Sequence, residues 1–280
     1  MNQWTVSREV AYTGPAIHTG TVTTIRIRPA QANTGIVFRR IDLPGCPQVK
    51  AAARHVWRTD RCTTLRDGDA EVATVEHLMA ALRGFGIDNA LIDVDGPEIP
   101  IADGSAAHFV DLIQEAVPVR LDAPRWVVKV DSPIWVRDGG RLALALPYDG
   151  FKVSFTFTND HRHPVLGDLF AEFEVDAATF KEEIASARTI GWLSEVQALK
   201  ERGLLLGATM DMAIVLSEDA ILTPLRYPDE PVRHKILDVI GDLYLSGYVH
   251  AHIVAVRSGH QINNRLARAI EARYPPGEGV

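Results

Sequence analysis

The stretch around residues 228–247 constrains the fold most, because it predicts one long helix with two different sides. Asp229 and Glu230 lie near the positive end of this helix, and Pro231 suits its first turn. Gly247 can end it. The apolar side, which can pack into a core, consists of Ile236, Leu237, Val239, Ile240, Leu243 and Tyr244.

Three ionisable residues of this helix, His234, Asp238 and Asp242, follow one another at intervals of four and therefore share one stripe. Zinc accepts imidazole nitrogen and carboxylate oxygen, and a catalytic zinc has three protein ligands and one open position. His234 and Asp238 can supply two of these ligands. We expect them at the margin or bottom of a cleft.

A second motif, Glu76-His77, can complete such a site. His77 is the best candidate for the third ligand, since its neighbour Glu76 would then lie beside the open position, where a base for the attacking water belongs. Alone, the histidine–aspartate spacing is usually a surface pair or a satisfied hydrogen bond, and Glu-His is an ordinary helix start; no spacing rule joins the two motifs. The metal site is thus a hypothesis.

Composition restricts the class of protein. The chain has 280 residues, 46% of them hydrophobic, and a formal charge of −7, which argues against a nucleic-acid binder. Two cysteines and no apolar leader favour the cytoplasm, and no run of residues is long and apolar enough to span a bilayer. We expect a monomer that takes any lipid substrate from water or from the membrane face.

The order of predicted elements indicates an α+β fold rather than alternating βαβ units. Strands are expected near residues 21–28, 35–40, 126–136, 141–146 and 151–158, and helices near 74–84, 105–115, 231–245 and 260–272. The proline-containing segment 118–124 punctuates the chain, so we place a domain boundary there.

Several segments, in a fixed order along the chain, resemble the bacterial zinc-dependent UDP-3-O-acyl-N-acetylglucosamine deacetylases of lipid A synthesis. These segments are residues 18–20, 74–82, 86–89, 95–107, 186–189, 232–242 and 258–264. The resemblance implies two similar layered α/β-sandwich domains, here 1–120 and 125–280, whose helices face each other with the active site at their interface. It also implies removal of the N-acetyl group from a UDP-linked acylated amino sugar, the committed step of that pathway.

The resemblance assigns roles to individual residues. It implies one zinc ion per chain, held by His77, His234 and Asp238, although iron(II) accepts the same ligands. Glu76 becomes the general base. The three further catalytic residues are His260, as second catalytic group, Asp242, which orients and charges it, and Thr189, whose hydroxyl steadies the oxyanion. A helix start at His260 disfavours a cation, whereas Asp242 favours one; if Asp242 dominates, His260 is a protonated acid.

The resemblance also implies a hydrophobic passage for the acyl chain within residues 188–216, although core packing is the usual role of a single apolar residue. Lys235 and Arg257 are its candidates for binding the remainder of the substrate, although solvent exposure is an equal alternative for Lys235. The passage positions are Trp192, Leu193, Val196, Leu205, Met210, Ala213 and Val215.

Departures from the family pattern at Asp60, Arg61, Leu146 and Ile190 leave a deacetylase of a different acylated N-acetyl amino sugar as an alternative. Two histidines and a carboxylate also describe a non-haem iron oxygenase, against which Glu76 argues. A binding protein without turnover is the third alternative.

Overall fold

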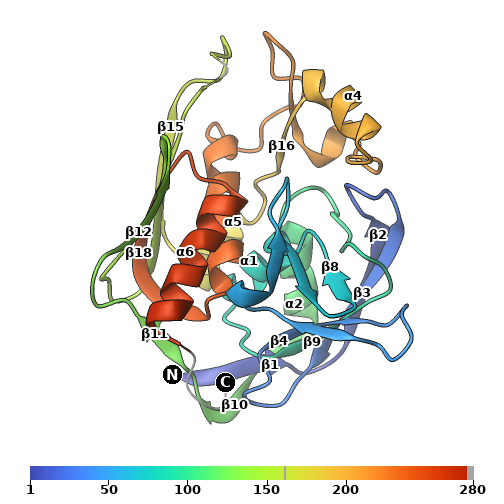
Figure 1. Cartoon of the computed structure of the whole chain (residues 1–280), viewed down its shortest axis with the longest axis vertical. Coiled ribbons are helices and arrows are strands. Elements are labelled where there is room, and N and C mark those ends of the chain that lie inside the picture. The colour runs from blue at the N-terminus through green and yellow to red at the C-terminus, as the bar shows by residue number, and fades with distance from the viewer. Residues whose placement is uncertain (161, 276–280) are drawn as a thin grey trace.

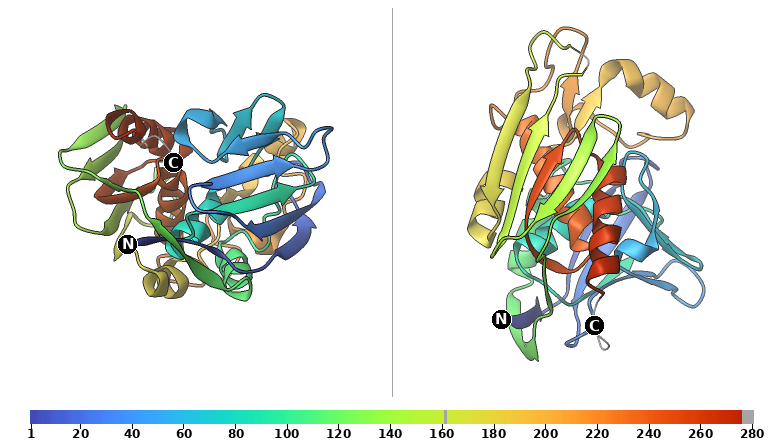
Figure 2. Two further views of the ribbon diagram at one scale, coloured as in Figure 1. Left: turned by 90° about the horizontal axis from the view of Figure 1, so that it is seen from below. Right: turned by 60° about the vertical axis from the view of Figure 1, so that its left-hand side comes forward.

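Two β-sheets enclose a layer of helices in the computed structural model, which describes residues 1–160 and 162–275 (Figure 1). The view from below separates the three layers, with the helices between the sheets (Figure 2). The α+β class predicted from the sequence is therefore confirmed. No helix in the described ranges is long and apolar enough to cross a membrane.

The two sheets share one strand order. The first sheet runs β2 (Val10–Pro15), β3 (Val22–Pro29), β9 (Ala90–Val94), β4 (Ile36–Arg40), β5 (Gln48–Lys50), and only the β4–β9 pair is parallel. The second runs β12 (Ile134–Asp138), β13 (Arg141–Leu146), β18 (Tyr248–Val256), β14 (Phe151–Phe157), β15 (Leu169–Glu174), and along this path only β14–β18 is parallel. The short β11 (Val127–Lys129) also pairs with β18.

In each half, one helix precedes the central strand and another follows it. These helices are α1 (Glu76–Gly84) and α2 (Ala107–Glu115) around β9, and α5 (Glu230–Tyr244) and α6 (His260–Arg273) around β18. Each of the four agrees with a predicted helix within two residues at either end. The division into domains at residues 120–125 stays a prediction, and residues 276–280 of the second domain lie outside the described part.

The contact between α1 and α5 brings the two sequence motifs together. A Cβ atom added to Gly241 would lie only 2.0 Å from the backbone oxygen of Glu76, so the helices can approach this closely only because residue 241 is glycine. Leu78, Ile236 and Ile240 are fully buried. This crossing fixes Glu76 and His77 opposite the ionisable stripe of α5.

Each half also carries an insertion before the helix that bears its sequence motif, α1 in the first half and α5 in the second. The first contains the 3-10 turn Ala53–His55 and the sheet of β6 (Val56–Arg58), β7 (Thr64–Asp67) and β8 (Ala70–Val72). The second contains β16 (Ile190–Trp192), α4 (Leu193–Glu201), the 3-10 turn Met210–Met212 and β17 (Ile214–Leu216). This second insertion follows α3 (Ala177–Thr179) and a short π-helix, Phe180–Ile184.

Two sequence predictions need correction. The proline-containing segment at the predicted domain boundary, Pro118–Pro124, is strand β10, which the predicted strands did not include. It pairs with β1 (Asn2–Val6), and its prolines stand at the strand ends of a two-stranded ribbon, where a missing N–H is tolerated. The single strand predicted over 126–136 is divided into β11 and β12, because β11 pairs with β18 whereas β12 pairs with β13. Pro133 lies in the break.

Candidate active site

Three side chains from α1 and α5 converge on one point. The Nε2 atom of His234 lies 3.3 Å from Oδ1 of Asp238, and Nε2 of His77 lies 3.8 Å from the same oxygen. The two imidazole rings stand edge to face with centroids 5.1 Å apart. One potential ligand atom from each residue lies within 4.8 Å of the other two, so the three residues could hold one metal ion.

The protonation of His234 strengthens this interpretation. Its Nδ1 lies 3.1 Å from the carbonyl oxygen of Ala187, which can only accept, so Nδ1 carries the proton. In the neutral ring, Nε2 is then an acceptor directed at another acceptor, Oδ1 of Asp238. That oxygen is buried and has no hydrogen-bond partner among the described residues. A cation between them would resolve this repulsion.

Burial and charge keep these groups in the forms that bind a metal. Burial, reinforced by His234, lowers the pKa of His77 to about 3, and burial likewise lowers the pKa of His234. Burial would raise the pKa of Asp238, but the nearby His234 and Lys235 lower it below its ordinary value. Two neutral imidazoles and one carboxylate form a donor set suited to zinc or iron(II).

Glu76 lies beside this cluster at the start of α1 and is only 3% exposed. The backbone N–H of Thr63 donates to its Oε2 at 2.9 Å, and its Oε1 lies 3.9 Å from Nε2 of His260. Burial raises the pKa of Glu76 to about 8. A carboxylate with such a pKa can take up a proton near neutral pH.

His260, the first residue of α6, faces Glu76 from the second half of the chain. Its Nδ1 donates to Oδ2 of Asp242 at 2.9 Å. Burial would lower the pKa of His260, but Asp242, Asp238 and Glu76 outweigh it and raise the pKa to about 10. Among these acidic neighbours Asp242 has the largest effect, and together they favour the protonated ring.

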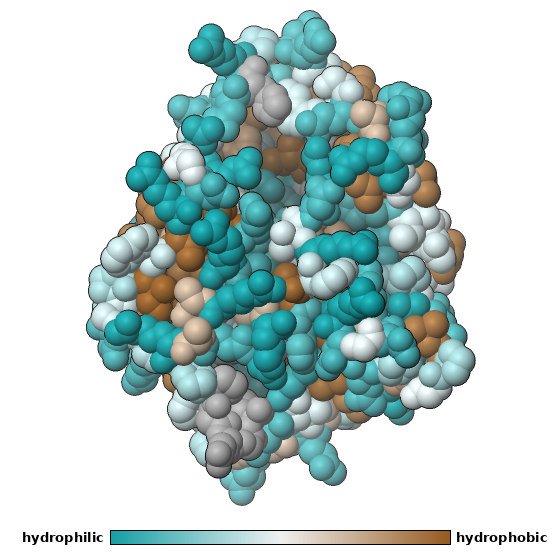
Figure 3. All heavy atoms as spheres, in the orientation of Figure 1, coloured by the Kyte–Doolittle hydropathy of each residue, from teal (hydrophilic) through white to brown (hydrophobic). Residues whose placement is uncertain are grey.

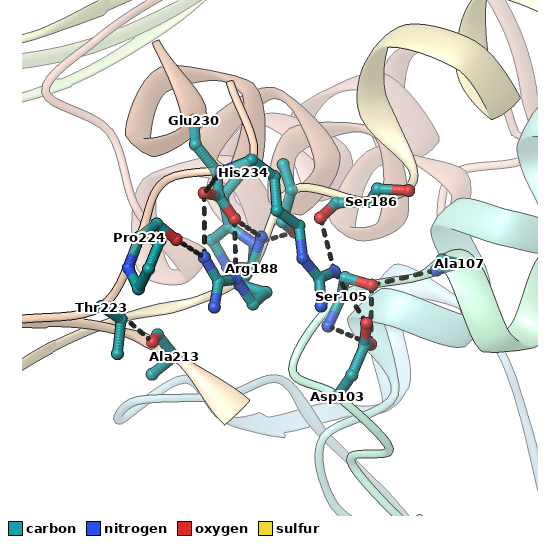
Figure 4. Close-up of polar contacts among 12 residues, drawn as sticks. Asp103, Ser105, Ala107, Ser186, Arg188, Ala213, Thr223, Pro224, Glu230 and His234 are labelled. Atoms are coloured by element: carbon teal, nitrogen blue, oxygen red, sulfur yellow. Dashed lines mark hydrogen bonds and ion pairs between the residues drawn. The ribbon is translucent and has the colours of Figure 1, made fainter. Parts of the chain in front are cut away.

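The segment that supplies the Ala187 carbonyl is anchored to the first turn of α5 (Figure 4). The fully buried Glu230 accepts hydrogen bonds from the backbone and guanidinium of Arg188, both at 2.9 Å from Oε1. The next residue, Thr189, is held by its backbone between the Gly104 carbonyl and the Ile214 N–H. Thr189 lines the same cavity as the cluster.

A cavity of about 830 Å³ joins the cluster to the second insertion. The molecular surface is hollowed between α4 and the second sheet, and apolar atoms lie inside the hollow (Figure 3). Every predicted passage residue lines this cavity: Trp192, Leu193, Val196, Leu205, Met210, Ala213 and Val215. The two insertions thus provide its walls.

Lys235 and Arg257 also line the cavity. The Lys235 ammonium donates to Oδ2 of Asp238 at 2.9 Å, and the Arg257 guanidinium donates to Asp160 at 2.7 Å. Asp242 lies behind His260 and is fully buried. The structure therefore brings together the predicted metal, catalytic and passage residues around one space.

Sequence reasoning missed several residues that support these groups. Thr63 bonds to both Glu76 and Asp242, and Asn263 donates to Asp242 at 2.9 Å. The carbonyl of Ala187 orients His234. Asn263 and Ala187 belonged to segments that carried the resemblance, but no spacing signalled their contacts, because they depend on pairing between distant elements.

The chain is similar throughout to proteins of one kind. A family model described as UDP-3-O-acyl N-acetylglycosamine deacetylase matches residues 3–272. A protein named UDP-3-O-acyl-N-acetylglucosamine deacetylase from Acidithiobacillus ferrooxidans is 45% identical over 100% of this chain and 93% of its own length. Proteins of the same name from Citrifermentans bemidjiense (43% identical; 97% and 89% covered) and Idiomarina loihiensis (42%; 100% and 93%) are comparably similar.

Proposed function

The chain belongs to the UDP-3-O-acyl N-acetylglycosamine deacetylase family, and we propose how its own residues perform that hydrolysis. It removes the N-acetyl group from UDP-3-O-acyl-N-acetylglucosamine, releasing acetate and a free amine in lipid A biosynthesis. One observation carries the assignment of residues. The carboxylate of the buried Glu76 and the half-buried ring of His260 face each other beside three converging metal-ligand atoms.

We propose that His77, His234 and Asp238 hold one zinc ion per chain, and iron(II) would suit the same atoms. The unpartnered Asp238 oxygen and the acceptor nitrogen of His234 support this assignment. A divalent ion bound there polarises a carbonyl group and makes water more acidic. Lys235, which bonds to the second oxygen of Asp238, orients that carboxylate.

Glu76 is the general base in this proposal. Its carboxylate takes a proton from the water that attacks the acetyl carbonyl carbon, and the Thr63 N–H at 2.9 Å keeps the carboxylate in place. Burial raises the pKa of Glu76 to about 8, so its carboxylate is a stronger base than an exposed one. Glu76 precedes the proposed ligand His77 in the chain, and its Oε1 lies 3.9 Å from Nε2 of His260.

His260 is the acid. The carbon–nitrogen bond breaks only when the departing amine gains a proton, and an imidazolium with a pKa raised to about 10 by acidic neighbours holds one across the neutral range. Asp242 orients the ring through its 2.9 Å bond to Nδ1, which leaves Nε2 directed at the site. Thr189, on the cavity wall, supplies a hydroxyl for the negative oxygen that develops on the substrate.

The apolar part of the cavity is assigned to the acyl chain, and Lys235 and Arg257 to the nucleotide-sugar end of the substrate. The seven passage residues line a space of about 830 Å³, which is large enough for an extended hydrocarbon. Burial of each methylene group contributes about 0.8 kcal/mol. Binding of the acyl chain therefore supplies affinity away from the reacting bond.

Acetate release from UDP-3-O-acyl-N-acetylglucosamine by the purified protein tests the assignment. Chelation should abolish it, and Glu76→Ala should lower kcat by about 10² to 10⁴-fold, the usual contribution of a general base. The matched control is Glu201→Ala, at the exposed end of α4. Normal turnover by Glu76→Ala would reject the assigned base.

A deacetylase of a different acylated amino sugar is the second candidate, and the charged residues on the cavity wall favour it. Asp60, Arg61 and Glu195 line the cavity together with the predicted passage residues. Turnover of substrates with and without the acyl chain separates the candidates. Loss of the chain should impair the first activity and spare the second.

We also propose how the chain is divided into domains, where it is located and in which oligomeric state it acts. The shared strand order of the two sheets supports domains at 1–120 and 125–280, with the catalytic cluster at their interface. The unpaired Cys46 and Cys62 support a reducing compartment, the cytoplasm. We retain the monomer, with transient contact at a membrane surface, as the form in which this chain meets its substrate.

A further inference from the structure

Thr63 touches groups from both halves of the molecule, although it belongs to neither motif helix. It lies just before β7 in the first insertion and is fully buried. Its N–H donates to Oε2 of Glu76 at 2.9 Å, and its hydroxyl donates to Oδ1 of Asp242 at 2.5 Å. One residue thereby bonds to the proposed base and to the partner of the proposed acid.

The direction of the hydroxyl hydrogen bond is fixed by a third group. Nδ2 of Asn264 donates to Oγ1 of Thr63 at 3.1 Å and to the carbonyl of His260 at 2.8 Å. Exchanging the nitrogen and oxygen of this amide would set two acceptors against each other at the His260 carbonyl, so the assignment stands. Because the Thr63 oxygen accepts from Asn264, its own proton points to Asp242.

This proton completes the hydrogen bonding of a fully buried carboxylate. Oδ2 of Asp242 accepts from His260 and from Asn263, both at 2.9 Å, and Oδ1 accepts from Thr63. A buried carboxylate that loses one donor rotates or recruits another, and either change moves the His260 ring that it holds. The Thr63 hydroxyl thus determines where the imidazolium lies relative to Glu76.

We propose that Thr63 is a positioning residue, which sets the distance between Glu76 and His260 by binding Glu76 through its backbone and Asp242 through its hydroxyl. This inference rests on the proposed function, because it takes Glu76 as base and His260 as acid. Thr63 touches neither substrate nor metal ligands in this assignment. Its effect should therefore fall on kcat rather than on KM or metal content.

The test compares Thr63→Val with Thr63→Ser. Valine retains the shape and the N–H to Glu76 but removes the hydroxyl, so kcat should fall about 10- to 100-fold with KM and bound zinc unchanged, as expected for a lost bond to a charged group. Serine retains the hydroxyl and should keep kcat within about threefold of the wild type. The matched control, Thr64→Val, alters a buried neighbour whose hydroxyl lies 3.8 Å from the Cys62 sulfur.

A double-mutant cycle with His260→Ala separates positioning from general damage. If Thr63 acts through Asp242 and His260, Thr63→Val should cost no further activity in the His260→Ala background. An equal loss in both backgrounds, or full activity of Thr63→Val, would overturn the inference. If the valine variant does not fold, Thr63→Ser is compared with Thr63→Ala instead. A higher kcat for Thr63→Ser supports the inference, and equal kcat values reject it.

The outcome also distinguishes this inference from the proposed function. A wild-type protein that releases no acetate from the acylated substrate, in the presence of zinc or iron(II), defeats the proposed function and this inference with it. An active wild type whose Thr63→Val variant is equally active defeats the inference alone.

Discussion

The cavity has an inner end at the metal-ligand cluster and an outer end at the second insertion, and the residues at the two ends differ in burial and in charge. At the inner end, Asp238, Asp242 and His77 are at most 4% exposed, and the two carboxylates are paired with Lys235 and His260. At the outer end, the lining residues Leu193 and Met210 are 47% and 49% exposed, and the ion pairs are on the surface. A buried charge without its partner is costly, whereas an exposed apolar residue is nearly indifferent to its neighbours.

This difference separates chemistry from specificity. The inner groups should tolerate little change, because they are buried and both carboxylates depend on specific partners. The outer residues contribute area rather than directed bonds, so their identity can vary while the reaction is retained. Substitutions should therefore have effects that decline from the inner end to the outer end.

The largest effect is expected for Asp238→Ala. It removes a ligand and leaves His77 and His234 facing each other without the carboxylate, so bound metal should be lost together with activity. The loss should exceed the roughly 10- to 100-fold cost of removing an outer partner of a metal ligand. Metal analysis of the purified variant, beside an acetate-release assay, measures both.

The control for this variant is Asp211→Ala, which changes an exposed carboxylate of the second insertion. Stoichiometric zinc in Asp238→Ala with wild-type turnover would show that the inner end does not depend on this cluster.

Asp242→Asn should have the next largest effect and should appear in the pH profile. The Asp242 carboxylate favours the charged ring of His260, whose pKa is raised to about 10, so its removal lowers that pKa. The basic limb of kcat/KM should move to lower pH, and activity at pH 8 should fall about 10- to 100-fold.

The comparison variant is Asp149→Asn, whose carboxylate lies 3.8 Å from Nδ1 of His250, outside the cavity. It should leave the profile unchanged. An unaltered basic limb in Asp242→Asn would mean that His260 is not the group that must stay protonated.

The sequence predicted those site contacts that lie within one helix, but not those that join distant elements. Spacing on α5 was sufficient to group His234 with Asp238, since i and i+4 residues share a helix face whatever the fold. Joining them to His77 needed the resemblance, because the α1–α5 crossing depends on the glycine at position 241 and not on any local pattern. Thr63 gave no signal, since its partners come from three separate elements.

Errors in the fold had a similar origin. The prolines of β10 indicated a break between a helix and a strand, and only the pairing with β1, more than a hundred residues away, makes the segment a strand. Local propensity describes a segment in isolation, and distant pairing overrides it. Strands β13 and β14, whose apolar residues recur at strand spacing, were predicted within one residue.

Passage substitutions should have moderate effects that depend on the substrate. Val196→Ser removes apolar area on α4, so KM for the acylated substrate should rise about three- to tenfold, with little change in kcat. Turnover of the same sugar nucleotide without its acyl chain should be unaffected. The neighbouring Gln197→Ser, outside the cavity lining, is the control. Equal effects on both substrates would place the acyl chain elsewhere.

The smallest effect is expected at the ion pairs that join the insertions, Asp60–Arg202 and Arg61–Glu195, each 2.9 Å long. Exposed pairs contribute about 0.2–1 kcal/mol, so Asp60→Asn should change KM by less than about fivefold. This change in KM should become smaller at high salt, because salt screens the interaction between surface charges.

Combining Asp60→Asn with Arg202→Gln decides whether this pair helps to form the passage. Two changes that break one contact should cost no more together than either does alone. A large, salt-independent loss from Asp60→Asn would instead place a directed polar contact with the substrate at the outer end. The gradient from inner to outer end would then fail at this position, and a charged group in the substrate would explain why Asp60 and Arg61 replace apolar residues.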